Sequence, residues 1–219
     1  MNKKDRAAKL MEFLDTKYSD AKCSLEHKNP FELIVATVLS AQCTDERVNK
    51  VTGELFDKYP TPDKMSKANV EDIMNIVRPT GFYKNKAHNI LKIAEAICNK
   101  YEGMLPLEIK ELVKLPGVGR KTANVVIGNF SEPVGIVVDT HVKRIAGRLG
   151  LTCSDKPDII EKDLMTLIPK NKWNVFSHQM IDFGREICSA RKPKCIKCDL
   201  SEYCEYFQKK KRGGIIEKI

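Results

Sequence analysis

Apolar residues recur with a helical period along almost all of this 219-residue chain. Where they return every three to four residues they line one face of a helix, whereas a strand would need strict alternation. The segment 31–39 is the most apolar case. Asn29 and Pro30 precede it and supply an N-cap and a first helical residue. We therefore predict a buried helix here.

The same pattern, bounded by capping residues and chain breaks, predicts helices along the rest of the chain. Thr44 can cap a helix that runs to about residue 56, and Asn69 can open another that ends near Pro79. Further helices are expected over residues 83–101, 108–115, 120–129, 140–149, 158–168 and 173–188. Only 133–138 has an extended pattern, and one short strand cannot form a sheet. The predicted fold class is all-α.

The net charge is +9, because lysine and arginine outnumber aspartate and glutamate. Such a positive field attracts a polyanion, so nucleic acid is the leading candidate partner, although many basic proteins do not bind it. No apolar stretch approaches the roughly 20 residues that span a bilayer. We therefore expect no membrane partner and a cytoplasmic location, where clustered cysteines favour metal binding or catalysis over disulfides.

Four of the eight cysteines lie in one short segment, with six, two and five residues between them: Cys188, Cys195, Cys198 and Cys204. Two metal sites use four thiolates. Structural zinc sites commonly arrange them as two close pairs separated by a longer loop. A [4Fe–4S] cluster is likewise held by four thiolates, which a compact loop can deliver. The spacing alone favours the iron–sulfur cluster only modestly.

A glycine-rich turn, Leu-Pro-Gly-Val-Gly, occupies residues 115–119 between two predicted helices. Gly117 and Gly119 allow backbone N–H groups to approach a ligand, and the N-terminus of the next helix, beginning with Arg120, favours a phosphate. Lys121 lies in that first turn, where the helix dipole disfavours its charged form. A neutral amine is a nucleophile that can form a Schiff base. Chemistry alone leaves this role and simple phosphate binding about equally supported.

A second candidate is Asp139, which precedes the helix predicted over 140–149. It can cap that helix, and it can also act as a catalytic carboxylate that assists deprotonation of an amine. His141, Lys143 and Arg144 follow at the helix start and are candidate phosphate or sugar contacts.

Several strings together resemble the endonuclease III family of DNA glycosylases: the cysteine spacing, Leu-Pro-Gly-Val-Gly-Arg-Lys-Thr-Ala at 115–123, Val-Asp-Thr-His at 138–141, Leu-Ser-Ala-Gln-Cys-Thr-Asp at 39–45 and the loop at 79–86. The resemblance covers about residues 6–206. It implies a [4Fe–4S] cluster, a helix-hairpin-helix motif, and catalytic roles for Lys121 and Asp139. It also implies two helical lobes, residues 20–132 and residues 1–19 with 133–208, with DNA and the active site in the cleft between them.

The resemblance also implies residues that open the duplex, since an enzyme acting on a paired base must extrude it. Gln42 carries an amide that can enter the vacated space, although it can also be an ordinary polar helix end. Phe82 can wedge between bases. It is larger than the aliphatic residue that many relatives have there, so the resemblance does not fix the lesion preference. Arg191, Lys192 and Lys194, held by the cluster loop, are expected to contact phosphates, and 209–219 is expected to be a mobile basic tail.

We therefore predict a base excision repair enzyme that excises oxidised pyrimidines and then cleaves the strand 3′ to the abasic site. Its expected partner is double-stranded DNA with damaged bases or abasic sites, bound as a monomer and, in a prokaryote, at the nucleoid. Two other functions remain open. A monofunctional mismatch glycosylase would not need Lys121, and a DNA-binding or redox module without catalysis would leave Lys121 and Asp139 together unexplained.

Overall fold

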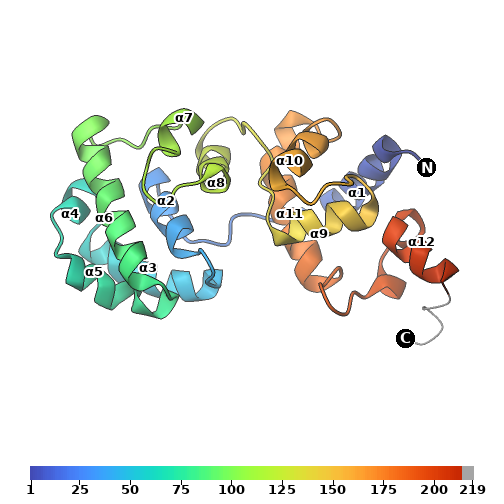
Figure 1. Cartoon of the computed structure of the whole chain (residues 1–219), viewed down its shortest axis with the longest axis horizontal. Helices are drawn as coiled ribbons and strands as arrows, with labels where there is room; N and C mark the ends of the chain where they lie inside the picture. Colours follow the sequence, from blue (N-terminus) through green and yellow to red (C-terminus); the bar gives the residue numbers. More distant parts are fainter. Residues whose placement is uncertain (214–219) are drawn as a thin grey trace. The chain divides into compact units, whose positions relative to one another are not determined.

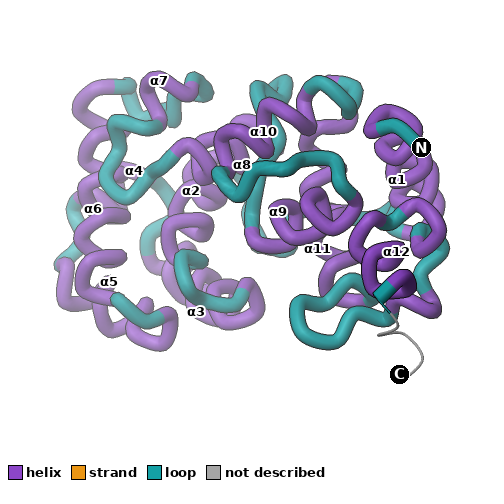
Figure 2. The backbone as a smooth tube through the Cα atoms, turned by 45° about the vertical axis from the view of Figure 1, so that its right-hand side comes forward, coloured by secondary structure: helices purple, strands orange, loops and turns teal. Residues whose placement is uncertain are grey.

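The computed structural model describes residues 1–213, in which the regular elements are helices and no strand occurs (Figures 1 and 2). This confirms the all-α prediction. Within that range no helix combines the length and the apolar character that crossing a membrane requires. The chain forms two compact units. One, the hairpin unit, is Cys23–Glu132; the other, the cysteine unit, combines Met1–Lys22 with the chain from Pro133 onward.

The hairpin unit is a set of helices packed on one apolar core. Its longest helix, α6 (Tyr83–Lys100), packs against α4 and α5, while α2 packs against α3, α6 and α8. In chain order its other elements are α2 (Pro30–Leu39), α3 (Asp45–Lys58), α4 (Pro62–Ser66), α5 (Val70–Val77), the 3-10 turn η1 (Arg78–Thr80), α7 (Ile109–Leu112) and α8 (Arg120–Phe130).

Helix α2 lies at the centre of this core, as its sequence predicts. Eight of its ten residues are buried. Its N-terminus is closed by polar groups, because Asn29 Oδ1 accepts from the Glu32 N–H at 2.9 Å and the Glu32 carboxylate accepts from the Lys28 N–H at 2.7 Å. These bonds satisfy N–H groups that a buried helix end would otherwise leave unpaired.

The cysteine unit has its own core, in which α11 (Trp173–Glu186) packs against α1 (Lys3–Lys17) and α9 (Thr140–Leu149). Phe13 of α1 meets Phe183 of α11 edge to face, with ring centroids 5.1 Å apart. The remaining elements are α10 (Pro157–Met165), the 3-10 turns η2 (Lys170–Lys172), η3 (Cys195–Lys197) and η4 (Ser201–Tyr203), and α12 (Glu205–Arg212).

The periodic pattern placed most helices correctly and did not include α1, α4 and α12. Caps at Asn29, Thr44, Asn69 and Asp139 are all confirmed. The helix expected over 108–115 is limited to α7, because the chain turns after Leu112 to form the hairpin. The segment 133–138 is irregular rather than a strand. Thr61 and Pro62 cap and begin α4, which the periodic pattern did not predict.

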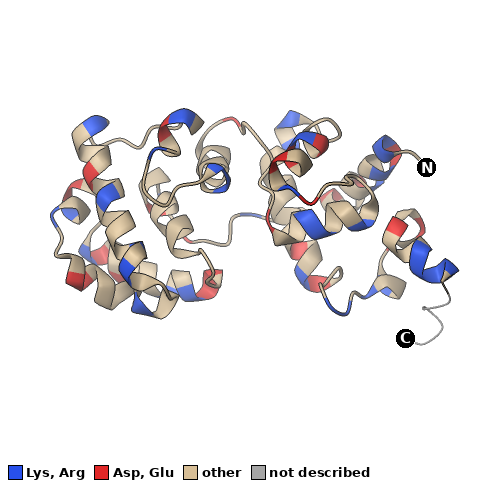
Figure 3. Cartoon of the chain, in the orientation of Figure 1, with Lys and Arg blue, Asp and Glu red and all other residues tan. Residues whose placement is uncertain are grey.

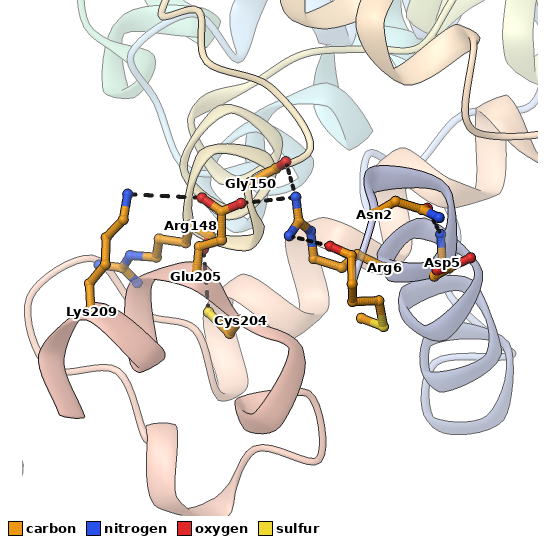
Figure 4. Close-up of polar contacts among 9 residues, drawn as sticks. Asn2, Asp5, Arg6, Arg148, Gly150, Cys204, Glu205 and Lys209 are labelled. Atoms are coloured by element: carbon orange, nitrogen blue, oxygen red, sulfur yellow. Dashed lines mark hydrogen bonds and ion pairs between the residues drawn. The ribbon is translucent and has the colours of Figure 1, made fainter. Parts of the chain in front are cut away.

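The predicted basic tail begins inside a helix. Residues 209–212 form the last turn of α12, and residues 214–219 lie outside the described residues. The start of α12 is held in place: Arg6 Nη2 forms an ion pair with Glu205 Oε1 at 2.9 Å and donates to the Gly150 carbonyl, also at 2.9 Å (Figure 4). One arginine therefore joins α1, the end of α9 and the start of α12.

Gly150 is required at this junction for two reasons. It ends α9 in the left-handed conformation, with φ of 69°, and a Cβ there would overlap the Glu205 carboxylate that Arg6 holds. Gly103 also has a positive φ, of 82°, but has open space around it. Comparing substitutions at the two glycines therefore distinguishes the cost of a left-handed backbone from the cost of the clash with Glu205.

We expect Gly150→Ala to lower the free energy of unfolding by about 2–3 kcal/mol and Gly103→Ala by about 1–2 kcal/mol, since both adopt left-handed backbone but only the first displaces Glu205. Urea unfolding measures both. In a Glu205→Ala background the additional cost at Gly150 should disappear. Equal losses of unfolding free energy at the two glycines would show that the contact with Glu205 adds no cost at Gly150.

Candidate functional site

The glycine-rich turn is a hairpin anchored by its apolar residues. Leu115 and Val118 are buried, and the Val118 N–H donates to the Leu115 carbonyl at 3.1 Å. Gly117 and Gly119 lie beside them and are exposed. The buried side chains therefore anchor the turn in the core, while the backbone at the two glycines faces solvent.

The two glycines of the hairpin serve different purposes. Gly117 has φ of 74°, which favours glycine, and a Cβ there would lie 2.6 Å from Nδ2 of Asn89 on α6, so the Asn89 side chain would have to shift. Gly119 has an ordinary extended φ and is the N-cap of α8. No described side chain caps that helix. Its first N–H groups can therefore receive an anionic oxygen, as a DNA phosphate would supply.

Lys121 is exposed in the first turn of α8, directly after this cap, and Arg120 beside it is exposed as well. Packing does not hold the Lys121 amine in the core, so it can reach a ligand placed at the hairpin. The geometry supports both readings of the sequence, a nucleophile and a phosphate contact.

Gln42 and Phe82 share an unusual backbone conformation. Both have positive φ, 54° and 48°, a region that residues with a side chain rarely adopt. Gln42 lies in the loop between α2 and α3 and is exposed. Phe82 precedes α6 and is 68% exposed, which is high for an aromatic side chain. Backbone strain of this kind persists where the surroundings enforce it, and it is concentrated at functional positions.

Asp139 caps α9 with one carboxylate oxygen. Its Oδ1 accepts from the His141 and Val142 N–H groups, both at 2.8 Å. Upstream, the Val137 N–H donates to the Ser177 hydroxyl at 3.1 Å, which ties the segment to α11. Capping therefore occupies Oδ1 and leaves Oδ2 available for another group. The capping role and a catalytic role are compatible.

His141 and Arg144 form a contact inside the cysteine unit. Arg144 Nη2 donates to His141 Nδ1 at 3.1 Å, and Arg144 Nε donates to the Cys188 carbonyl at 3.1 Å. Burial lowers the pKa of His141, and Arg144 lowers it further against the opposing effect of Asp139. A guanidinium can only donate, so Nδ1 is the acceptor and the neutral ring carries its proton on Nε2. Lys143 is exposed, whereas Arg144 is engaged within the unit.

The four clustered cysteines line one pocket. Its walls are otherwise mainly apolar and include Ile145, Leu149, Phe183 and Ile187. Burial raises the pKa of the Cys195 and Cys204 thiols and that of Cys198 to about 11, and neighbouring thiols add to the effect. Within residues 1–213 no three or more His, Cys, Asp or Glu side chains are grouped closely enough to hold a single metal ion. A sulfur-only donor set around a common apolar pocket fits an iron–sulfur cluster chemically, and the ligand assignment stays a prediction.

The sequence did not single out Arg148, the residue that holds the start of the cysteine loop. From α9, its Nη1 donates to the Ser189 carbonyl at 2.7 Å and to Cys188 Sγ at 3.3 Å, and its Nη2 donates to the Ala190 carbonyl at 2.8 Å. Its guanidinium also lies over the Tyr206 ring, 4.7 Å from the centroid. The Cys204 thiol donates to the Arg148 carbonyl at 3.4 Å (Figure 4). Sequence reasoning missed Arg148 because a cation in the last turn of a helix is already accounted for by its favourable interaction with the helix dipole.

The cysteine loop also carries positive charge. Arg191, Lys192 and Lys194 are exposed on it. Figure 3 colours the Lys and Arg positions along the backbone blue. With Lys197, Lys210 and the apolar Ile196 and Phe207 they line a second, concave surface. Loop and α12 together thus offer a basic surface for phosphates.

Comparison with known proteins agrees with these features. A family model described as the HhH-GPD superfamily base excision DNA repair protein matches residues 35–170. Endonuclease III of Synechocystis is 47% identical over 204 residues, 93% of this chain and 93% of that protein. For endonuclease III of Bacillus subtilis the identity is 44% over 216 residues, 96% and 98% of the two chains.

Two solved structures of endonuclease III with DNA are similar over nearly the whole chain. A non-covalent complex matches with a TM-score of 0.91 and 45% identity, covering 97% of this chain and all of that one. A trapped covalent intermediate matches with a TM-score of 0.90 over the same shares.

We expect Arg148→Met to accelerate iron loss to a chelator by roughly 10-fold or more, because hydrogen bonds from a charged group contribute about 1.5–3 kcal/mol each. Absorbance during chelation measures this. Arg212→Met, which removes an exposed arginine from α12, is the control and should behave as wild type.

The wild-type protein purified without oxygen should contain iron and acid-labile sulfide. A single zinc and no iron would contradict the cluster assignment.

Proposed function

The chain belongs to the endonuclease III family of the HhH-GPD superfamily of base excision DNA repair proteins, and on this premise we propose that it excises oxidised pyrimidines and cleaves the strand 3′ to the abasic site. As a member of that family it is a repair enzyme of the DNA glycosylase and lyase type. The observation that carries the finer proposal is the exposed Lys121 at the hairpin.

Lys121 acts as the nucleophile in this proposal. Its neutral amine attacks C1′ of the damaged nucleotide, forming a C–N bond as the bond between C1′ and the base breaks. Opening of the sugar gives a Schiff base, which makes the C2′ proton acidic. Loss of that proton and of the 3′ phosphate as leaving group then cuts the strand. The trapped covalent endonuclease III–DNA intermediate, from a protein 45% identical to this chain, supports such a route.

Asp139 serves as the catalytic carboxylate. Its Oδ2, which capping leaves available, accepts a proton from the attacking amine and stabilises positive charge that develops on the sugar as the base departs. Because Oδ1 is fixed by two backbone N–H groups, the carboxylate is oriented before substrate binds.

DNA is held and opened by the exposed groups. Gly117, Gly119 and Arg120 contact a phosphate at the hairpin, while His141, through its Nε2 proton, and Lys143 contact the backbone from α9. Gln42 fills the space left by the extruded base and Phe82 wedges between bases. Arg144, whose guanidinium is engaged with His141 and Cys188, serves chiefly to orient this region.

The cysteines Cys188, Cys195, Cys198 and Cys204 hold a [4Fe–4S] cluster in this proposal. The cluster supplies an anchor for the basic loop, since neither base excision nor elimination is a redox step. Ordering Arg191, Lys192 and Lys194 in advance reduces the conformational entropy that they lose on binding phosphates.

A monofunctional mismatch glycosylase is the alternative. A thermostable thymine-DNA glycosylase matches with a TM-score of 0.84, but at 23% identity this likeness shows only the fold. The exposed lysine at the hairpin favours the bifunctional route.

Lys121→Gln should abolish borohydride trapping on a thymine-glycol duplex and abolish strand cleavage, while DNA binding stays within a few-fold of wild type, because only the nucleophile is removed. Gel analysis and a binding titration measure these. Lys110→Gln, which removes an exposed lysine on the neighbouring α7, controls for lost charge. Persistent trapping in Lys121→Gln would assign the reaction to another amine.

Asp139→Asn separates the two roles of this residue, since asparagine caps a helix about as well as aspartate. Stability should therefore be retained, while single-turnover base release slows by roughly 10²-fold or more, as for typical acid–base groups. Binding should not weaken, because a negative charge near phosphates is lost. Asp158→Asn, in the exposed first turn of α10, is the charge control. Excision by Asp139→Asn within a few-fold of wild type would leave Asp139 only a cap.

A further inference from the structure

Lys86 is a buried lysine in the hairpin unit that the proposed chemistry does not use. It lies in the first turns of α6 and is only 5% exposed. Its position continues the apolar face formed by Ile90, Ile93 and Ile97. Lysine is rarely buried in such a face unless it is paired, because removing an ammonium from water costs free energy.

The Lys86 ammonium is bonded to the backbone of the loop that presents Phe82. Nζ donates to the Thr80 carbonyl at 2.8 Å, in buried surroundings. Thr80 is itself 2% exposed, and its hydroxyl donates to the Val77 carbonyl at 2.8 Å. The chain after Thr80 passes through Gly81 and Phe82, both with positive φ, before α6 begins. Lys86 therefore fixes Thr80, the residue that directly precedes the two positive-φ residues Gly81 and Phe82.

The loop that presents Gln42 affects the same ammonium through its electrostatics. Burial lowers the pKa of Lys86, and the side chain of Cys43 acts in the opposite direction. Cys43 directly follows Gln42, and its N–H donates to the Ser40 carbonyl at 3.0 Å. The buried cation is therefore bonded to the loop that presents Phe82, and its link to the loop that presents Gln42 is electrostatic only.

Stability alone does not account for a lysine at this position. An apolar side chain of similar length would fill the same volume without the desolvation cost, and such replacements of buried charges are often neutral or stabilising. What an apolar residue cannot do is bond the Thr80 carbonyl. That carbonyl would lose its buried donor, and the conformation of the following Gly81–Phe82 pair would be less firmly imposed.

We propose that Lys86 is a positioning residue for duplex opening: through the Thr80 carbonyl it fixes the strained loop that projects Phe82 toward DNA. The inference rests on the proposed function, in which Phe82 wedges between bases. Lys86 does not touch the substrate. It acts on the reaction only where a base must be unstacked from a duplex.

The test compares a substrate that needs unstacking with one that does not. Lys86→Met, in the full-length cluster-containing protein, should slow single-turnover excision from a thymine-glycol duplex by about 10-fold or more, since misplacement by about 1 Å can cost on the order of 10²-fold. Cleavage at an abasic site in single-stranded DNA should stay within about 2-fold, which also shows that the variant is folded. Lys84→Met, an exposed lysine on the same turn, is the matched control and should be unchanged.

A double variant determines whether Lys86 acts through Phe82. If it does, Lys86→Met adds little to the duplex defect of Phe82→Ala, so the two effects are strongly non-additive. If Phe82→Ala is defective on the duplex, three results overturn the positioning role alone: normal excision by Lys86→Met, a loss in Lys86→Met that is as large on single strands as on the duplex, or a loss that adds to that of Phe82→Ala in the double variant. Normal duplex excision by Phe82→Ala overturns the proposed wedge, and the role of Lys86 with it.

Discussion

Helix ends impose the constraint on which the placement of the candidate site depends. The first N–H groups of a helix have no partner within it, so each buried or crowded end needs a cap or a ligand. Asp139 satisfies two such groups and keeps a second oxygen for chemistry. Helix α8 begins at Arg120, after the N-cap Gly119, and no described side chain caps it, so its N-terminus suits a phosphate. Because both helices are packed in apolar cores, their ends are held at fixed positions.

Cations bonded to carbonyl oxygens then determine the shape of the loops. Lys86 binds the backbone before Phe82, Arg148 binds the start of the cysteine loop, and Arg6 binds the end of α9. Each long side chain leaves a helix and satisfies a carbonyl that no regular element pairs. The first two of these loops carry exposed groups proposed to contact DNA. The helices are rigid, and these three side chains bond the adjoining chain segments to them.

The sequence predicted the fold class, most helices and their caps, because periodicity and capping are local properties. The periodic pattern did not include α1, and it missed α4 and α12, which are both short. The candidate catalytic and metal residues came from motif strings, which record chemistry but not contacts. Arg148 lies outside those strings. Lys86 ends the 79–86 string but was given no role there, although a lysine in line with Ile90 and Ile93 on an apolar helix face was a usable signal.

The central claim is that Lys121 is the nucleophile. Identifying the residue that becomes covalently bonded to the DNA tests this claim most directly. The wild-type protein, reacted with a thymine-glycol duplex and reduced with borohydride, would be digested with protease and nuclease, and the modified peptide sequenced by mass spectrometry. The account predicts that the sugar remnant is attached to the amine of Lys121, in the peptide that begins α8. A remnant attached to any other lysine, or to the N-terminal amine, would contradict it.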